Sequence, residues 1–428
     1  MTGYAIDAKR AWRDFSMLTA IPIMFLLVNG MVVPLPAVAS TPMDPTLFLL
    51  IWENPDGHNA NAWSVIWSPD GSVLSATYFD NTTVIFNSTT GMIVKRMEGG
   101  HHQLAADERW GTLGRPAPDP YCETNTPHPN CTDLRCSAWS PDGRYLAVGS
   151  DERTIRLYET ATWNEIRVLR GHQGSVLALE WSYDGKWLAS GSGRDKVRPK
   201  NIGENITKVW NTATLTCVAN LTGHKDGVLG LRWSRDCKYL ATASDDRVIK
   251  IWNVPAWTLL KNMTGHTSGV LDVTWSPDDT VIASGSRDYK LFLWDFAKGE
   301  HTAKWSEDNC VRSLDWNPRE NLIVNGIVGG NGANIRNAST GNVLKTLTEA
   351  IPTSSTVLSA RWSPDGKRIA TSSGNDHCVR VYGIVPQSQQ PLTAPNWLPG
   401  VLLLTAVAAV GAIVIFYPLR RRFRERRG

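Results

Sequence analysis

Short apolar runs alternate with polar turns along most of the chain, and the pattern is clearest over residues 223–254. Three runs stand there, at 228–233, 238–244 and 248–252, and the turns between them are rich in Asp, Ser and Arg. Side chains in the third run alternate one by one, as they do in a strand with two different faces. Runs this short, bounded by Asp, Gly and Ser, predict β-strands rather than helices.

This unit is repeated along the chain, and the Trp that ends its first strand marks each copy. Seven such anchors stand at successive spacings of 72, 42, 52, 42, 41 and 46 residues: Trp67, Trp139, Trp181, Trp233, Trp275, Trp316 and Trp362. The sequence WSPDG begins at three of them, and its Pro-Asp-Gly run fixes a tight turn because Pro presets φ and Gly accepts a positive φ. A period near 42 residues with four strands per unit predicts an all-β, seven-bladed β-propeller.

The ends of the repeat region indicate how the ring closes. Residues 46–52 are an apolar strand with no partner before it, and the last unit has only three strands, at 357–363, 368–372 and 378–382. We expect the first strand to complete the last sheet, because this pairing removes two exposed sheet edges that invite aggregation.

The repeated Gly-His and Trp-Asp marks resemble the WD-repeat family over residues 46–384. The resemblance implies a hydrogen-bonded tetrad of His, Asp, Ser or Thr, and Trp in each blade. The matching positions are His224, Asp246 and Trp252 with either Thr242 or Ser244; His266, Ser284, Asp288 and Trp294; His172 and Trp210; and His58 and Asp80, with Phe86 in the place of Trp.

Three blades depart from the family pattern. Blade 2 has Tyr158 in the place of Trp, and blade 7 has Asp376 and Tyr382 without a His. Blade 6 departs most, because Arg336 stands in the place of Trp and no Gly-His precedes the first strand.

A set of His, Asp and Ser side chains also resembles a catalytic triad. Here the set repeats from blade to blade, whereas a catalytic site needs to occur once and to differ from its siblings. We therefore expect no enzyme activity, no catalytic residue, no cofactor and no metal. A propeller hydrolase or a quinone-dependent dehydrogenase is kept as an alternative, because propeller folds host enzymes.

The formal net charge of +4 is carried by the ends of the chain. Residues 420–427 carry +5 and residues 1–39 carry +1, so the rest of the chain carries −2. A nearly neutral body argues against a nucleic-acid groove. The expected partner is a protein or a peptide.

Two insertions exceed the repeat period, at residues 100–135 before the first strand of blade 2 and at 194–205 between the second and third strands of blade 3. Strands of a blade run up and down in turn, so both insertions should rise from one face, on neighbouring blades. Long loops on a rigid scaffold commonly carry recognition. Variable decoration of no function is the alternative.

The first insertion also holds a group of cysteines, Cys122, Cys131 and, beside it, Cys136. We expect a disulfide from Cys122 to Cys131, because an exported chain can oxidise its thiols and a bridge would hold a loop that lacks a core. Seven Asn-X-Ser/Thr sequons begin at Asn81, Asn87, Asn130, Asn205, Asn220, Asn262 and Asn337. The glycosylation candidates are Asn130 and Asn205, because both lie in the insertions.

Residues 1–39 fit a signal peptide. Lys9, Arg10 and Arg13 precede an uncharged stretch over residues 15–43, and small residues at 37–39 suit signal peptidase. An uncleaved membrane helix is the alternative.

The other end of the chain fits a membrane anchor. A Pro- and Gln-rich linker at 386–397 precedes a transmembrane helix at 398–419, whose first 20 residues are uncharged. The basic tail at 420–428 would keep the C-terminus in the cytoplasm.

These features predict a single-pass protein of the cell membrane with its propeller outside the cytoplasm. It would be a non-enzymatic binding or scaffold module that takes a protein or peptide ligand on the loop-bearing face. A structural component of a surface layer is a second alternative.

Overall fold

We analysed a computed structural model of the chain. It describes residues 25–28, 31–34, 43–44, 47–54, 60–98, 134–193, 204–329, 332–348, 356–374 and 376–384.

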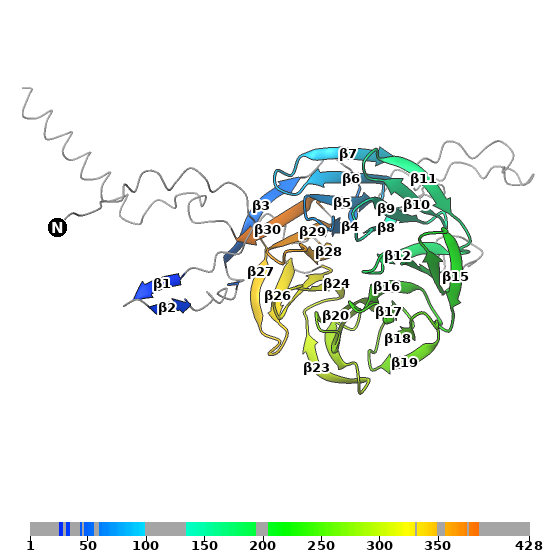
Figure 1. Cartoon of the computed structure of the whole chain (residues 1–428). Helices are drawn as coiled ribbons and strands as arrows, with labels where there is room; N and C mark the ends of the chain where they lie inside the picture. The colour runs from blue at the N-terminus through cyan, green and yellow to red at the C-terminus, as the bar shows by residue number, and fades with distance from the viewer. Residues whose placement is uncertain are drawn as a thin grey trace, which may run out of the picture. The chain divides into compact units, whose positions relative to one another are not determined.

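Seven four-stranded antiparallel sheets follow one another around a common centre (Figure 1). Blade 1 consists of β4 (Ala62–Trp67), β5 (Val73–Tyr78), β6 (Thr82–Asn87) and β7 (Ile93–Glu98). Blade 2 consists of β8 (Leu134–Trp139), β9 (Tyr145–Ser150), β10 (Ile155–Glu159) and β11 (Asn164–Leu169). Blade 3 consists of β12 (Ser175–Trp181), β13 (Trp187–Gly193), β14 (Thr207–Asn211) and β15 (Thr216–Leu221). Blade 4 consists of β16 (Val228–Trp233), β17 (Tyr239–Ser244), β18 (Val248–Asn253) and β19 (Leu259–Thr264).

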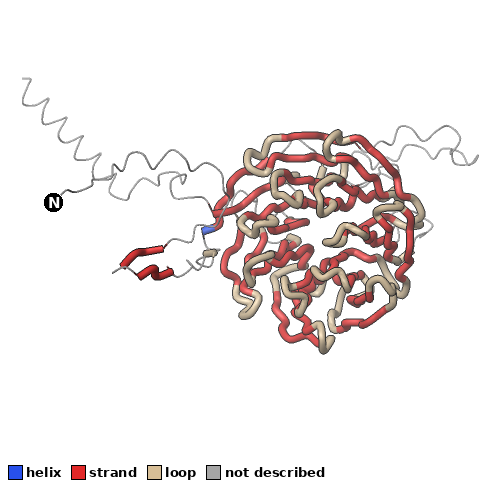
Figure 2. Tube along the Cα trace, viewed as in Figure 1, coloured by secondary structure: helices blue, strands red, loops and turns tan. Residues whose placement is uncertain are grey.

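The remaining blades complete the ring. Blade 5 consists of β20 (Val270–Trp275), β21 (Val281–Ser286), β22 (Lys290–Asp295) and β23 (Glu300–Ser306). Blade 6 consists of β24 (Val311–Trp316), β25 (Leu322–Ile327), β26 (Ala333–Asn337) and β27 (Val343–Leu347). Blade 7 consists of β28 (Val357–Trp362), β29 (Arg368–Ser373), β30 (Val379–Ile384) and β3 (Phe48–Asn54). In each blade the first strand lies near the centre and the last at the rim, and strands account for most of the trace in Figure 2. The seven-bladed propeller predicted from the sequence is therefore confirmed.

Blade 7 closes the ring with the two ends of the repeat region. Strand β3 pairs antiparallel with β30, in a register that joins Phe48 to Ile384 and Asn54 to Val379. Phe48 is fully buried and packs edge-on against Trp362, with ring centroids 5.7 Å apart. The closure predicted from the unpaired first strand is confirmed.

The anchor tryptophans join neighbouring blades, which explains why the repeat keeps them. All seven are buried between sheets. The indole N–H of Trp67, Trp181, Trp233 and Trp275 each donates to a backbone carbonyl of the preceding blade at 3.1 Å. In every case that carbonyl belongs to the residue just before the preceding anchor, so each Trp fills the wedge between two sheets and fixes their relative height.

Close packing between blades also requires glycine on several second strands. A Cβ added at Gly285 would lie 2.4 Å from Cγ1 of Val311, in the next blade. Gly191 stands in the same relation to Val228, at 2.8 Å. The inner valine of one blade therefore occupies the space that a side chain on its neighbour would need.

Strand direction gives the disc two different faces. We call the insertion face the one on which the first strand of each blade begins and the second strand ends, and the tether face the one on which the WSPDG-type turns lie. Strand β30 begins at the insertion face, where β29 ends, and runs to the tether face. Ile384 and its partner Phe48 therefore both lie at the tether face.

The chain divides into two compact units, Met1–Met43 and Asp44–Gly428. Within the first unit, β1 (Phe25–Val28) and β2 (Met31–Pro34) pair as an antiparallel hairpin. These strands fall inside the stretch interpreted as a signal peptide. Among the residues that the structure describes, no helix is both long and apolar enough to span a bilayer. The linker, helix and tail predicted at 386–397, 398–419 and 420–428 lie outside the described residues.

Candidate functional site

Blades 4 and 5 bring the expected tetrad residues together at the insertion face. In blade 4, His224 lies 2.9 Å from Asp246 through Nδ1 and 2.8 Å from Oγ1 of Thr242 through Nε2. The indole N–H of Trp252 donates to the same hydroxyl at 3.1 Å. Thr242, rather than Ser244, is therefore the hydroxyl member of this tetrad.

Blade 5 repeats the arrangement with serine. His266 contacts Asp288 at 2.9 Å and Ser284 at 2.8 Å, and the Trp294 indole donates to Ser284 at 2.8 Å. Each set ties the loop before the first strand to the turn after the second and to the third strand. These sets hold the loops of the insertion face in place.

Blade 3 completes its tetrad with two residues that the sequence analysis missed. His172 contacts Glu204 and Ser190, each at 2.7 Å, and the Trp210 indole donates to Ser190 at 2.8 Å. Glu204 lies at the end of the second insertion, in the place that Asp246 takes in blade 4. The spacing from the third strand was the signal that could have found it.

Burial and hydrogen bonds shift the pKa values of several tetrad side chains. Burial lowers the pKa of His172 and His266, and their acidic partners oppose this effect only in part. Burial also acts against ionisation of Asp246, but hydrogen bonds from His224 and from the Lys225 backbone N–H outweigh it and lower the pKa of Asp246 to about 2. Burial thus favours a neutral imidazole at His172 and His266, and the hydrogen bonds favour a charged carboxylate at Asp246.

Blade 6 replaces the tetrad with a different network. Glu307 stands four residues before the first strand, as His266 does in blade 5, and Arg336 stands in the place of Trp. The Glu307 carboxylate accepts from Nε of Arg336 at 2.7 Å and lies 2.6 Å from its Nη2. Asn325 and Asn334 each donate to the same carboxylate at 3.1 Å. A buried ion pair thus holds the loop that a His–Trp set holds elsewhere.

The other blades keep only parts of the pattern. His58 lies outside the described residues, and Asp80 accepts from the hydroxyl and the backbone N–H of Thr82 within its own turn. Tyr158 is buried in the place of Trp in blade 2. In blade 7, Asp376 accepts from Arg380 at 2.6 Å.

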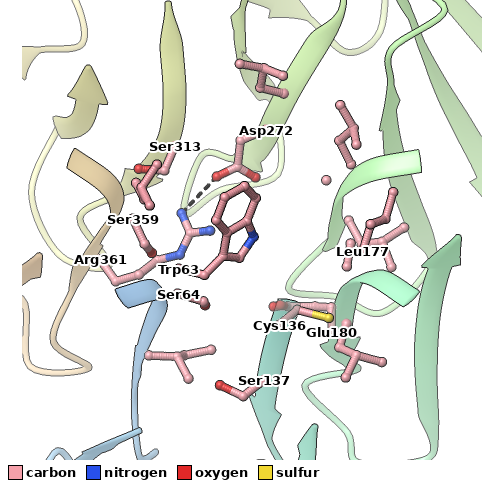
Figure 3. A pocket seen from close by; sticks show the side chains of 18 of the residues that line it. Trp63, Ser64, Cys136, Ser137, Leu177, Glu180, Asp272, Ser313, Ser359 and Arg361 are labelled. Atoms are coloured by element: carbon pink, nitrogen blue, oxygen red, sulfur yellow. Dashed lines mark hydrogen bonds and ion pairs between the residues drawn. The ribbon is translucent and has the colours of Figure 1, made fainter. Parts of the chain in front are cut away.

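A network of charged side chains crosses the central cavity. Arg232 donates to Glu180 at 3.2 Å and lies 3.5 Å from Asp315. Arg361 contacts Asp272 at 2.9 Å (Figure 3). Burial raises the pKa of Glu180 and of Asp315, although Arg232 opposes it. Four of these charges stand at one repeat position, just before the anchor Trp, so the centre is closed by ion pairs between blades.

This cavity is small. It encloses about 80 Å³ and is lined by all seven first strands. A volume of this size holds a few water molecules, because one water needs roughly 10–15 Å³ by such a measure. Side chains therefore fill most of the centre of the disc.

Above the charged layer, the first strands carry a ring of side chains at the mouth of the cavity. Each first strand has a β-bulge near its start, and the bulged residue is three positions before the one that precedes the anchor Trp. Six bulged residues line the cavity, and we call them the collar: Trp63, Leu177, Leu229, Leu271, Arg312 and Leu358. Bulges re-aim side chains out of the normal alternation. They make this collar apolar except at Arg312, whose guanidinium lies 4.8 Å from the Trp63 ring.

Both insertions join the described chain at the insertion face. The first leads into β8, which begins at Leu134. The second connects Gly193 with Glu204, and Glu204 contacts His172. Residues 99–133 and 194–203 lie outside the described residues, as do Cys122, Cys131 and Asn130. Asn205 is described, and its Nδ2 donates to the Lys225 carbonyl at 3.0 Å. Four other cysteines are free thiols: Cys217, Cys237, Cys310 and Cys378.

No group of three or more His, Cys, Asp or Glu side chains that could hold a metal ion is found in the described part of the chain.

Comparison with known proteins decides the family. The model of the WD domain, G-beta repeat, matches residues 52–87, 122–159, 163–198, 215–253, 257–295 and 341–383. This chain belongs to the WD-repeat family. The gap between the last two matches, 296–340, contains Glu307 and Arg336, so blade 6 departs from the family where its tetrad is replaced. Propellers of this family are suited to protein interaction.

Several curated relatives match parts of this WD-repeat chain. Anaphase-promoting complex subunit cdc20 of Dictyostelium discoideum is 36% identical over 110 residues, which is 26% of this chain and 20% of the relative. B-type cell cycle switch protein ccs52A of Medicago truncatula is 35% identical over 115 residues, 27% of this chain and 22% of the relative. Protein hir1 of Schizosaccharomyces pombe is 27% identical over 210 residues, 45% of this chain and 20% of the relative. The matches span about a fifth of the length of these relatives.

Proposed function

We propose that this propeller is a non-enzymatic binding module that takes a protein or peptide on its insertion face. The observation that carries the proposal is the collar. Six bulged strands turn side chains toward one opening, directly above a layer of ion pairs in the central cavity. A ligand can therefore dock on the collar but cannot pass through the disc.

The chemistry of the collar favours a peptide segment. Leu177, Leu229 and Leu358 are only partly buried, so they still have apolar surface to bury against a partner. Arg312 adds a cation beside Trp63. An apolar anchor with a polar rim is the usual anatomy of a protein interface.

Substitutions in the collar test this proposal. The full chain carrying Leu177→Glu and Leu229→Glu should lose partners that the wild type retains in affinity capture. The matched control is Leu259→Glu with Leu260→Glu, since these exposed leucines lie on the rim strand β19. Equal capture by the collar and rim variants, both with wild-type melting temperatures, would reject the collar as the binding site. Deleting residues 100–135 tests the first insertion in the same assay.

We further propose that the propeller is exported and anchored to the cell membrane by residues 398–419. The geometry of the described chain supports an outward-facing ligand site, because Ile384 leaves the disc at the tether face and the collar lies on the other face. Protease shaving of intact cells tests this location. A propeller that survives while a known surface protein is cut would contradict export.

A further inference from the structure

Six of the seven sequons lie in the described chain, and their surroundings differ. A native fold can carry a glycan only where the Asn amide reaches solvent, because the saccharide is bulky and hydrophilic. The Ser or Thr at the third position of the sequon must also be accessible for a folded chain to be recognised.

Two sequons lie in equivalent places on rim strands. Asn220 lies at the end of β15, with Thr222 directly after the strand, and Asn262 and Thr264 lie at the end of β19. All four side chains are exposed, whereas the residues between them, Leu221 and Met263, are 2% and 1% exposed. Side chains alternate along a strand, so a strand that buries the middle residue of the sequon presents its Asn and Thr together on the outer side.

The amides of these two asparagines are held by a lysine on the neighbouring strand. Nζ of Lys208 donates to Oδ1 of Asn220 at 2.9 Å, and Nζ of Lys250 donates to Oδ1 of Asn262 at 2.7 Å. Within the described part of the chain, Nδ2 of either residue makes no hydrogen bond. A glycan on Nδ2 leaves Oδ1 free to accept, so these lysine contacts are compatible with modification.

The other described sequons are less suited to modification. Nδ2 of Asn205 already donates to the Lys225 carbonyl at 3.0 Å, and Thr207 is fully buried. Asn81 has a positive φ of 67°, and its Thr83 is 1% exposed. At these two sites a glycan would require the folded chain to rearrange.

The remaining two asparagines are turned back on their own chain. Oδ1 of Asn87 accepts from the backbone N–H groups of Thr89 and Thr90 at 3.0 Å. Oδ1 of Asn337 accepts in the same way from Ser339 and Thr340, at 2.9 and 3.0 Å. Bonds to Oδ1 leave Nδ2 available, but both side chains are only partly exposed, whereas Asn220 and Asn262 are exposed.

We propose that Asn220 and Asn262 are N-glycosylation sites, which places saccharides on the rim of blades 3 and 4 and leaves the collar uncovered. The donor would be a saccharide linked to a lipid phosphate or pyrophosphate. Nδ2 forms a bond to the anomeric carbon and loses one proton, and the lipid phosphate leaves with the electron pair of the broken C–O bond. This inference rests on the proposed export of the propeller.

Glycopeptide mass spectrometry of the full chain tests the inference, using protein purified from membranes of a host that exports and N-glycosylates proteins. We expect glycans at Asn220 and Asn262 and none at Asn205. Thr222→Val and Thr264→Val should each remove one glycan while keeping the Asn–Lys hydrogen bonds. The matched control, Thr89→Val at the Asn87 sequon, should leave the glycan mass unchanged.

Protease shaving on the same cells separates the two proposals. Unmodified Asn220 and Asn262 in a chain that is cut at the cell surface would overturn the glycan sites and leave export standing. Glycans at Asn205 in place of the two rim sites would overturn them as well. A chain that is protected from protease and carries no glycan would overturn both proposals together.

Discussion

In blade 6, Nε and Nη2 of Arg336 both contact Oε1 of Glu307, and these two residues take the places that His266 and Trp294 occupy in blade 5. Their side chains are only 3% and 8% exposed. Both networks attach the loop before the first strand to the third strand. The blade 6 solution uses full charges and therefore depends on both partners being present.

Removing one member of this pair should be costly. Glu307→Ala leaves a buried guanidinium without its carboxylate, and we expect the free energy of unfolding to fall by about 3–5 kcal/mol. Chemical denaturation followed by tryptophan fluorescence measures the change. The matched control is Glu300→Ala, at the exposed start of the rim strand β23. A loss below about 1 kcal/mol for Glu307→Ala, as for a surface pair, would show that the pair does not hold the loop.

Acid should destabilise the propeller in two stages. Because the pKa of His172 and His266 is lowered from 6.5, the unfolded chain binds protons that the folded chain does not as the pH falls below about 6.5. Stability should therefore decrease from that pH downward. Asp246, with its pKa lowered from 3.8 to about 2, adds stability that is present above about pH 4 and is lost as the pH falls toward 2.

Unfolding free energies measured from pH 7.5 to 5 check the histidine stage. His266→Gln removes the titrating imidazole and should flatten this part of the profile. A wild-type protein whose stability is unchanged or rises over this range would contradict the pKa directions on which the prediction is based.

The tight contact at Gly285 predicts that an added side chain there destabilises the fold. Gly285→Ala places a methyl group 2.4 Å from Val311 Cγ1, and we expect a loss of about 1–3 kcal/mol from overpacking. Val311→Ala in the same chain removes the nearest clashing atom and leaves Leu314 Cδ2, at 2.8 Å, to shift. The double variant should therefore be more stable than the sum of the single changes implies, which a double-mutant cycle by denaturation measures. Additive effects would mean that the two positions do not compete for space.

The ion pairs at the centre should stabilise the fold more than the ion pairs at the surface. Arg232→Met leaves Glu180 and Asp315 without their shared cation, and we expect a loss of roughly 3 kcal/mol. The matched control is Lys238→Met, whose exposed pair with Asp236 should contribute much less to stability. Thermal unfolding of both variants compares them. Equal effects would show that the central network is screened like a surface pair.

Most of the fold could be predicted from the sequence because each blade repeats one pattern. The anchor Trp, the WSPDG turn and the unpaired first strand determine the number of blades and the closure. The tetrads of blades 4 and 5 follow from the same repetition. In blade 4 the choice between Thr242 and Ser244 needed coordinates, because both lie on the same strand within reach of the turn.

The missed residues take the hydrogen-bonding role of a family residue but are of a different residue type. Glu204 replaces Asp at the edge of an insertion, and Glu307 replaces His, so a search for the family residues passes over both. The central charges were hidden for another reason. Glu180, Arg232 and Asp315 are far apart in sequence, and only ring closure brings them together. The bulges of the collar leave no mark in the alternation of short strands.

The pairing of Phe48 with Ile384 has a mechanical consequence. Any pull on the chain beyond Ile384 enters the disc through β30, and the neighbours that bear the load are β29 on one side and β3 on the other. Resistance to tension then depends on a seam made from the two ends of the ring. The pairing of residues 48–54 with β30 would therefore limit the force that the disc withstands before it opens.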